Sequence, residues 1–239
     1  IKRIGIWRHK VAATGLQESA RLLRDAGLTV SSLCRGGWFD AATKSGRRVR
    51  LDDNLRAIDE AAELGAPVLV IVCGPAAGRD IGMGRQRSLE AIETLMPYAR
   101  ERRVRLGLEP LHPMFAADRS VLNTLGQAND FAARADGNAG VVVDVYHIWW
   151  DHAVATEVQR AGKRIVGFHV SDWIVPTPDI LLGRGVMGDG VIEIRKLRRM
   201  VDNAGYEGPI EVEILNRTVW DMPGDDLLEF IKTRFREHV

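Results

Sequence analysis

Short apolar runs, rich in β-branched residues, alternate with longer amphipathic stretches along the whole chain. Each apolar run is bounded by glycine, proline or polar residues. Runs of this kind, without strict apolar–polar alternation, are typical of strands that are buried on both faces of a parallel sheet. The predicted strands are Ile4–Trp7, Thr29–Cys34, Val68–Cys73, Arg105–Leu111, Val141–Val145, Ile165–Val170 and Ile210–Leu215.

The stretches between these strands carry helix end signals. Thr14 and Asp52 are placed to cap two helices, and Gly27 and Gly65 to end them, because short polar side chains cap helix starts and glycine favours helix ends. Pro223 marks the first turn of a last helix that continues to residue 237. Further helices are predicted at residues 85–103, from Ser120 or Asn123 to 137, and at 153–161 and 194–204.

This strand–helix alternation predicts one α/β domain over residues 1–239, with a parallel sheet. An open nucleotide-binding sheet is the alternative, but Gly82-Met83-Gly84 lacks the third glycine of a phosphate cradle. A closed TIM-type barrel needs eight strands, and seven are predicted. We therefore expect a (β/α)8-type barrel whose first strand–helix unit lies upstream of Ile1.

Composition narrows the range of partners. Of 239 residues, 46% are apolar, and the 33 basic side chains nearly balance the 32 acidic ones. The chain therefore has no global field for nucleic acid or for an anionic membrane, and no apolar run approaches the ~18 residues of a membrane span. Two separate cysteines, Cys34 and Cys73, make no disulfide framework. We expect a cytoplasmic protein, able to form a homo-oligomer, that acts on a small molecule.

Four polar residues interrupt the ends of four consecutive predicted strands. They are Glu109, Asp144, His169 and Glu213. In a barrel the carboxyl ends of the strands meet at one mouth, so we expect these side chains to converge. Three carboxylates at one mouth repel each other unless a cation is present. The donor set suits one divalent ion and favours Mn²⁺ or Mg²⁺, with Co²⁺ and Zn²⁺ as alternatives.

Two further residues belong to the same predicted mouth. His147 follows Asp144 by three residues, so it lies just past a strand and can face the open side of the ion. Glu211 has the same strand parity as Glu213 and should point inward one layer below it. We interpret Glu211 as a buried structural partner and not as a fifth ligand.

Five short motifs resemble those of the xylose-isomerase-like superfamily, and more closely its sugar phosphate isomerase/epimerase branch. The resemblance implies that Glu109, Asp144, His169 and Glu213 bind the metal, that Glu109 and Glu213 transfer protons, and that His147 contacts a substrate oxygen. The motifs cover essentially the whole chain and are specific for the fold and the metal site, but not for the substrate. They are Leu108-Glu109-Pro110-Leu111, Asp144-Val145-Tyr146-His147, Phe168-His169-Val170-Ser171-Asp172, Gly188-Asp189-Gly190-Val191-Ile192 and Ile210-Glu211-Val212-Glu213.

The substrate side departs from the family pattern. Many epimerases of the family carry arginine six residues after the ligand histidine, where this chain has Val175, and Arg184 is the candidate replacement. His112 stands where many relatives have asparagine. Trp173 and Arg35 lie in predicted loops on the same face. Trp173 is a candidate for an apolar wall against a sugar ring, and Arg35 is a candidate to bind a carboxylate or phosphate.

The resemblance implies proton abstraction next to a carbonyl through a metal-stabilised enediolate. Return of the proton gives a metal-dependent isomerase or epimerase of a sugar or sugar derivative. Loss of a β-hydroxyl from the same intermediate gives the alternative, a lyase acting on an oxo-cyclitol, a dehydroshikimate-like acid or an oxidised glycoside. An accessory subunit is disfavoured because all four ligands are present. A DNA-repair nuclease is disfavoured by only six histidines and a net charge of +1.

Overall fold

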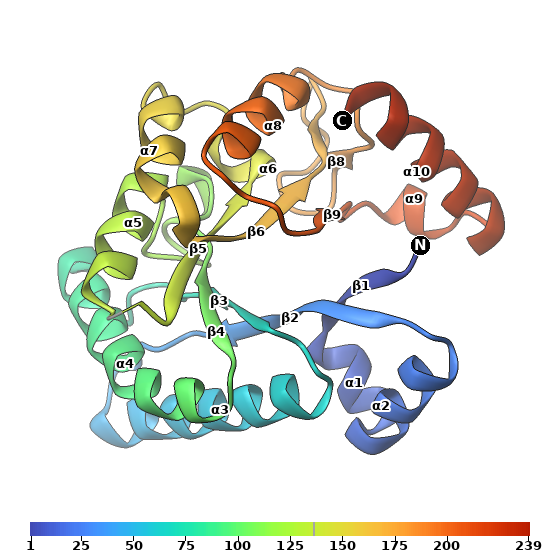
Figure 1. Ribbon diagram of the computed structural model, residues 1–239. Helices are drawn as coiled ribbons and strands as arrows, with labels where there is room; N and C mark the ends of the chain where they lie inside the picture. The colour runs from blue at the N-terminus through green and yellow to red at the C-terminus, as the bar shows by residue number, and fades with distance from the viewer. Residues whose placement is uncertain (136) are drawn as a thin grey trace.

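A computed structural model describes residues 1–135 and 137–239 of the chain. Seven parallel strands curl into a nearly closed barrel with helices around the outside (Figure 1). Their order is β1-β2-β3-β4-β5-β6-β9, so consecutive strands are neighbours. This confirms the predicted TIM-type fold and its seven strands. The strands are β1 (Arg3–Trp7), β2 (Thr29–Gly37), β3 (Val68–Val72), β4 (Arg105–Leu108), β5 (Ala139–Asp144), β6 (Ile165–Val170) and β9 (Ile210–Val212).

The helices connect the strands on the outside of the barrel, and a small antiparallel pair, β7 (Asp172–Trp173) and β8 (Arg184–Gly185), follows β6. Every helix that the structure describes is too short or too polar to cross a bilayer. The helices are α1 (Arg8–Thr14), α2 (Leu16–Asp25), α3 (Lys44–Glu63), α4 (Ile81–Glu101), η1 (Pro113–Phe115), α5 (Leu125–Arg134), α6 (Val145–Ile148), α7 (Val154–Ala161), η2 (Gly162–Arg164), α8 (Ile194–Asn203), α9 (Arg217–Trp220) and α10 (Gly224–His238).

Four predicted helix starts were wrong. Helix α4 begins at Ile81 and not at residue 85, so Gly82-Met83-Gly84 is part of the helix. Thr14 is the last residue of α1 and not a cap, because β1 passes into a helix without a loop. Asp52 lies inside α3, which begins after Thr43, whose hydroxyl accepts a hydrogen bond from an amide in the first turn. The basic stretch at the start of α3 hides its helical pattern. Helix α5 is capped by Thr124 and by neither Ser120 nor Asn123.

Side chains alternate between the barrel interior and the helices, as parallel strands require. Leu69 and Ile71 of β3 belong to the main core, which packs the sheet against the helices. Val70 instead packs inside the barrel with Cys34 and Val142. Both cysteines of the chain are buried and free. The polar strand ends of β4, β5, β6 and β9 lie on this inward parity, so they face the same space.

The sheet edges at β1 and β9 face each other across a cavity. Among the described residues the two strands do not pair, and Figure 1 shows α10 beside this opening, near the N-terminus. The cavity has a volume of about 740 Å³ and is lined by β1, β9 and α10. Its inner end reaches His169 and Glu213, so the opening leads to the strand ends described below.

The end of β2 is held by one buried amide. Asn54 of α3 accepts a hydrogen bond from the Gly37 amide at 2.6 Å and donates to the Gly37 carbonyl at 2.8 Å. Gly37 has φ of 108°, and a Cβ atom there would lie 1.8 Å from the carbonyl oxygen of Val72. Only glycine fits this position without movement of the backbone.

We expect Gly37→Ala to lower the free energy of unfolding by about 2 kcal/mol or more, because it adds a backbone clash to an unfavourable φ. Gly78→Ala is the matched control, since an added Cβ there meets no atom within 4 Å. Urea unfolding of both variants measures the difference. Equal stability of the two variants would contradict this account of the β2 end.

Candidate metal centre

Four strand ends bring the predicted ligands together. Asp144 ends β5, His169 lies near the end of β6, and Glu109 and Glu213 directly follow β4 and β9. One ligand atom from each side chain lies within 4.8 Å of all the others. The Nδ1 atom of His169 is 3.4 Å from Glu109 Oε1 and 3.8 Å from Glu213 Oε2. The four groups are therefore close enough to share one ion.

The donor atoms at this position are poorly satisfied by the protein itself. Within the described residues, Glu109 Oε1 and both ring nitrogens of His169 are buried and make no hydrogen bond. Leaving such groups unpaired costs free energy. Three carboxylates and one imidazole are suitable ligands for a hard or borderline divalent cation. The residues present therefore fit a bound divalent ion.

Burial and mutual repulsion shift the ionisation of the cluster. Burial raises the pKa of Glu109 to about 7, and nearby Glu213 adds to the rise. Burial also raises the pKa of Asp144. Burial alone would raise the pKa of Glu213, but Arg184 and then His169 hold it well below its ordinary value. Burial opposes the charge on His169, yet the carboxylates of Glu109 and Glu213 raise its pKa.

Arg184 places a positive charge inside the cluster. Its Nη1 donates to Asp144 Oδ2 at 2.9 Å and to Glu213 Oε2 at 3.1 Å, and its Nη2 lies 3.1 Å from His147 Nε2. The guanidinium also lies over the ring of Tyr146, 4.5 Å from its centre. The structure thus brings Arg184, the candidate replacement for the family arginine, into contact with two of the four predicted ligands.

Arg184 belongs to the long segment after β6. Hydrogen bonds to Asp172 hold both ends of this segment together and so place Arg184 at the cluster. The Asp172 carboxylate accepts hydrogen bonds from the amides of Trp173, Gly188 and Ile192 at 2.8–3.0 Å. Asp172 and Gly188 belong to two of the sequence motifs, and their shared contact gives both motifs a structural role. The segment between them delivers Arg184 to the barrel mouth.

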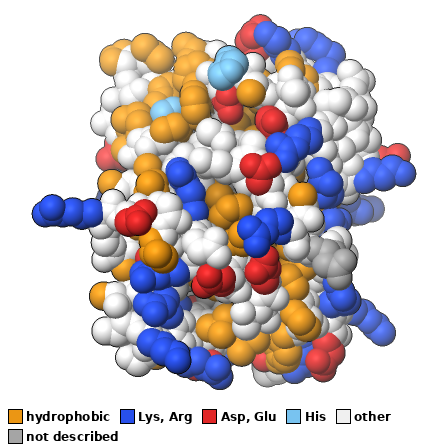
Figure 2. All heavy atoms as spheres, turned by 90° about the vertical axis from the view of Figure 1, so that its left-hand side faces the viewer, with side chains coloured by type: hydrophobic (Ala, Val, Ile, Leu, Met, Phe, Trp, Pro, Cys, Tyr) orange, Lys and Arg blue, Asp and Glu red, His pale blue; other side chains and the backbone are white. Residues whose placement is uncertain are grey.

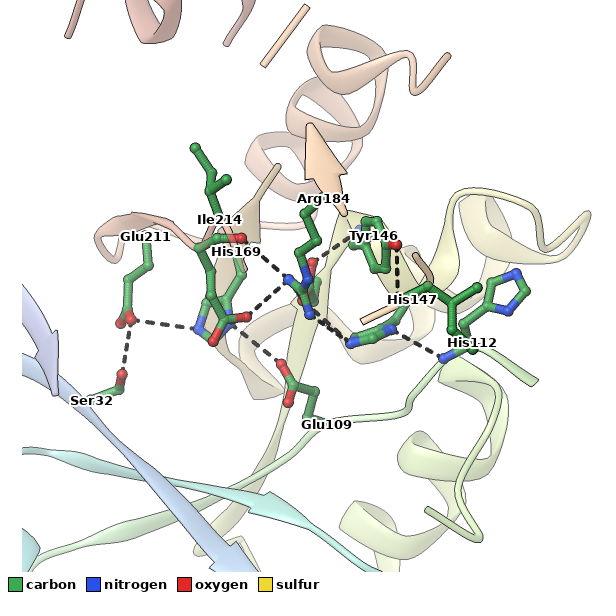
Figure 3. Close-up of polar contacts among 12 residues, drawn as sticks. Ser32, Glu109, His112, Tyr146, His147, His169, Arg184, Glu211 and Ile214 are labelled. Carbon is green, nitrogen blue, oxygen red and sulfur yellow. Dashed lines mark hydrogen bonds and ion pairs between the residues drawn. The ribbon is translucent and has the colours of Figure 1, made fainter. Parts of the chain in front are cut away.

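His147 lies on the other side of Arg184 from His169 (Figure 3). Its Nδ1 accepts the backbone N–H of His112 at 3.2 Å, and its Nε2 is 3.6 Å from Asp144 Oδ2. Burial, and then the Arg184 charge, lower the pKa of His147 well below its ordinary value. The neutral form of His147 is therefore favoured, and the ring lies beside the cluster.

The remaining predicted contacts lie further out. The His112 ring points away from Glu109 and His169 (Figure 3) and lies 4.9 Å from the Trp173 ring. Trp173 stacks on Tyr146 at 4.6 Å. In the described part of the chain Arg35 makes no hydrogen bond or ion pair with the four ligands, and its guanidinium instead lies 3.5 Å from the centre of the Trp38 ring.

A second set of residues supports His169 from below. Glu211 Oε2 lies 3.7 Å from His169 Nε2 and accepts a hydrogen bond from Ser32 Oγ at 2.9 Å (Figure 3). A Cβ atom on Gly5 would lie 2.2 Å from this same oxygen, so the glycine leaves room for the carboxylate. The sequence analysis identified Glu211 by strand parity. It missed Ser32 and Gly5, whose only signal is a small residue in each of the first two strands.

Comparison with known proteins gives one family. A family model described as xylose isomerase-like TIM barrel matches residues 4–234. The crystal structure of a protein from Sinorhizobium meliloti 1021 is 46% identical, with a TM-score of 0.96 over 99% of this chain and 88% of that chain. A search of curated proteins found no match.

Two more distant structures resemble the chain in fold. The IOLI protein with a bound zinc atom is 18% identical, with a TM-score of 0.82 over 99% of this chain and 87% of that chain. D-psicose 3-epimerase from Clostridium cellulolyticum H10, solved with D-tagatose, is 16% identical, with a TM-score of 0.78 over the same shares of the two chains. Both likenesses extend over nearly the whole chain.

We expect Glu211→Gln to weaken Mn²⁺ binding by about 10- to 100-fold, because a negative carboxylate 3.7 Å from His169 Nε2 is replaced by a neutral amide. Titration calorimetry of the metal-free protein measures the affinity. Glu207→Gln, which removes an exposed carboxylate near β9, should leave the affinity unchanged. Equal affinities in the two variants would show that Glu211 does not support the centre.

The apparent Mn²⁺ affinity should rise as the pH is raised through about 7, because Glu109 must lose its proton to become a ligand. In the metal-free protein the raised pKa of Glu109 instead makes the native state less stable as the pH rises. The native state keeps a proton that the unfolded chain releases near pH 4.5, so stability falls between about pH 4.5 and 7. Metal titrations and thermal unfolding at pH 6 and pH 8 test both trends, and pH-independent binding would contradict the first.

Proposed function

The chain belongs to the xylose isomerase-like TIM barrel family, and from this membership we propose that it is a divalent-metal-dependent isomerase or epimerase of a sugar or sugar derivative. The observation that carries the proposal is the convergence of four ligand atoms within 4.8 Å at the barrel mouth. Solved relatives of the same fold include D-psicose 3-epimerase and a 3-keto-D-glucoside 4-epimerase from E. coli. We treat residues 1–239 as one catalytic domain.

In this proposal Glu109, Asp144, His169 and Glu213 hold one ion. The bound ion would supply the Lewis acidity that makes a C–H bond beside a carbonyl easier to deprotonate. Three carboxylate ligands favour Mn²⁺, with Mg²⁺ or Co²⁺ as alternatives. The zinc atom in the IOLI structure makes Zn²⁺ the other candidate.

We assign proton transfer to Glu109 and Glu213. The two carboxylates approach the same nitrogen of His169 from different strands. Their pKa values are pushed in opposite directions, that of Glu109 up to about 7 and that of Glu213 down. Those shifts belong to the metal-free protein; in the proposed reaction one of the two carboxylates accepts the proton from the substrate carbon and the other returns one.

Arg184 and His147 are proposed to bind the oxygen atoms of the substrate. Arg184 is buried and fixed by two carboxylates, so its charge is already in place when negative charge develops on an enediolate oxygen. A preorganised charge of this kind stabilises such an intermediate more than solvent does. His147 is neutral and can exchange a hydrogen bond with a neighbouring hydroxyl group. His112 and Trp173 form the aromatic wall outside them.

The ligand class in this proposal is a small carbohydrate. Basic and acidic side chains are interspersed over the face shown in Figure 2, as the near balance of charges in the sequence predicts. Return of the proton to the same carbon gives epimerisation, and return to the neighbouring carbon gives isomerisation. Departure of a β-hydroxyl instead would give the lyase reaction, which the experiment below separates.

The test is to incubate the Mn²⁺-loaded protein in D₂O with a panel of ketoses, oxo-cyclitols and oxo-acids. Deuterium that enters a carbon-bound position without loss of water supports an isomerase or epimerase. An enone or aromatic product that absorbs in the ultraviolet identifies a lyase. Absence of both signals over the whole panel would contradict the proposed class of reaction.

Glu213→Gln should slow deuterium entry by at least about 10²-fold, because it removes one of the two groups that transfer the proton. Nuclear magnetic resonance follows the exchange, and metal content is measured in parallel. Glu207→Gln is the control and should exchange at the wild-type rate. Full metal content together with full exchange in Glu213→Gln would remove this residue from the mechanism.

A further inference from the structure

Arg35 lies at an irregularity in β2, beside the barrel mouth. Cys34 pairs with Val70 of β3 and Gly36 pairs with Ile71, so Arg35 is an extra residue on its strand. Such bulges turn a side chain out of the regular alternation of a sheet and are common beside active sites. The Arg35 side chain therefore leaves the strand instead of packing in the sheet.

The guanidinium of Arg35 is held by an aromatic ring and not by an acid. It lies 3.5 Å from the centre of the Trp38 ring, a close cation–π contact. Trp38 is itself fixed, because its backbone N–H donates to the Val72 carbonyl at 3.0 Å. Throughout the described residues, no carboxylate lies within ion-pair distance of Arg35, although the side chain is half-buried. Its hydrogen-bond donors remain available to a ligand.

A cavity of about 410 Å³ opens at this arginine. Its wall includes Trp7 and Cys34, which also line the larger cavity that reaches His169 and Glu213. The Arg35 cavity and the cavity that reaches the predicted metal ligands are therefore neighbours with two wall residues in common.

The charge around this cavity favours an anion. Asp53 is the carboxylate in its wall, and it is already paired with Arg8 at 3.1 Å and with Arg56 at 3.0 Å. Arg50, also in the wall, has no ion-pair partner among the described side chains. Arg35 and Arg50, which have no acidic partner among the described residues, thus line a cavity in which the charge of Asp53 is already balanced by two other arginines.

We propose that Arg35, stacked on Trp38, binds an anionic group of the substrate, a carboxylate or a phosphate, at the end remote from the reacting carbonyl. The inference rests on the proposed function and narrows its substrate class to acidic sugar derivatives. A planar guanidinium can form two parallel hydrogen bonds with either anion. The ring of Trp38 holds that plane in place before the ligand arrives.

Three ketoses that differ only at carbon 6 provide the test: D-fructose, D-fructuronate and D-fructose 6-phosphate. Titration calorimetry with the Mn²⁺-loaded wild-type protein measures the three affinities. We expect at least one of the two anions to bind about 10-fold or more tightly than D-fructose. The anion that binds more tightly distinguishes a carboxylate from a phosphate.

Arg35→Gln should weaken binding of the preferred anion by about 10- to 100-fold and change D-fructose binding by less than about twofold. Arg35→Lys keeps the charge but loses the planar stacked group. Its affinity for the anion should therefore lie between those of the wild-type protein and Arg35→Gln. Arg48→Gln, which removes an exposed arginine of α3 paired with Asp52, is the control and should bind like the wild type. Thermal unfolding checks that the variants are folded.

Equal binding of the three ketoses by the wild-type protein, or no binding of either anion at millimolar concentration, would overturn the proposal without any variant. Full anion preference in folded Arg35→Gln would also overturn it. The D₂O exchange is run on the same samples. Arg35-dependent anion binding without exchange supports the anion site and contradicts the reaction class. Exchange with D-fructose without any preference for the anions supports the reaction class and contradicts the anion site.

Discussion

Three carboxylates converge with one imidazole at the mouth of the barrel, and the side chains around them offset the repulsion between the carboxylates. Strand parity leaves Glu109, Asp144 and Glu213 nowhere else to point. Part of the negative charge is balanced by Arg184, which bonds to two of the three acids. Of the remaining unpaired atoms, Glu109 Oε1 and one ring nitrogen of His169 are the ones that a cation would satisfy. The proposed chemistry follows from this electrostatic arrangement.

Much of this arrangement could be predicted from the sequence because it depends on strands. A polar residue at the end of an apolar run is visible in the sequence, and consecutive parallel strands bring such residues to one mouth. Glu211 could be placed one layer below Glu213 for the same reason. The helices were predicted less well at their starts. In α3 most of the residues before Asp52 are exposed, so the first half of that helix has little apolar periodicity, and Thr43 was overlooked as its cap.

The contacts between segments that are far apart in the chain were harder to predict from the sequence. Arg184 was only a candidate, because its position depends on how Asp172 holds the ends of a long irregular segment. Ser32 carries no signal that points to Glu211, since a buried serine on a strand is ordinary in sequence. The stacking of Arg35 on Trp38 depends on an irregular pairing at the end of β2. Sequence periodicity describes regular elements and not the departures from them.

The hydrogen bond between Ser32 and Glu211 joins residues that are 179 positions apart. It links the second strand to the last one across the unpaired edges of the sheet, where backbone pairing contributes nothing among the described residues. Contacts of long sequence separation carry a loop-closure cost and are typical of chains that fold slowly. The carboxylate beside His169 is therefore held from the opposite end of the chain, so the candidate centre depends on segments from both ends of the barrel sequence.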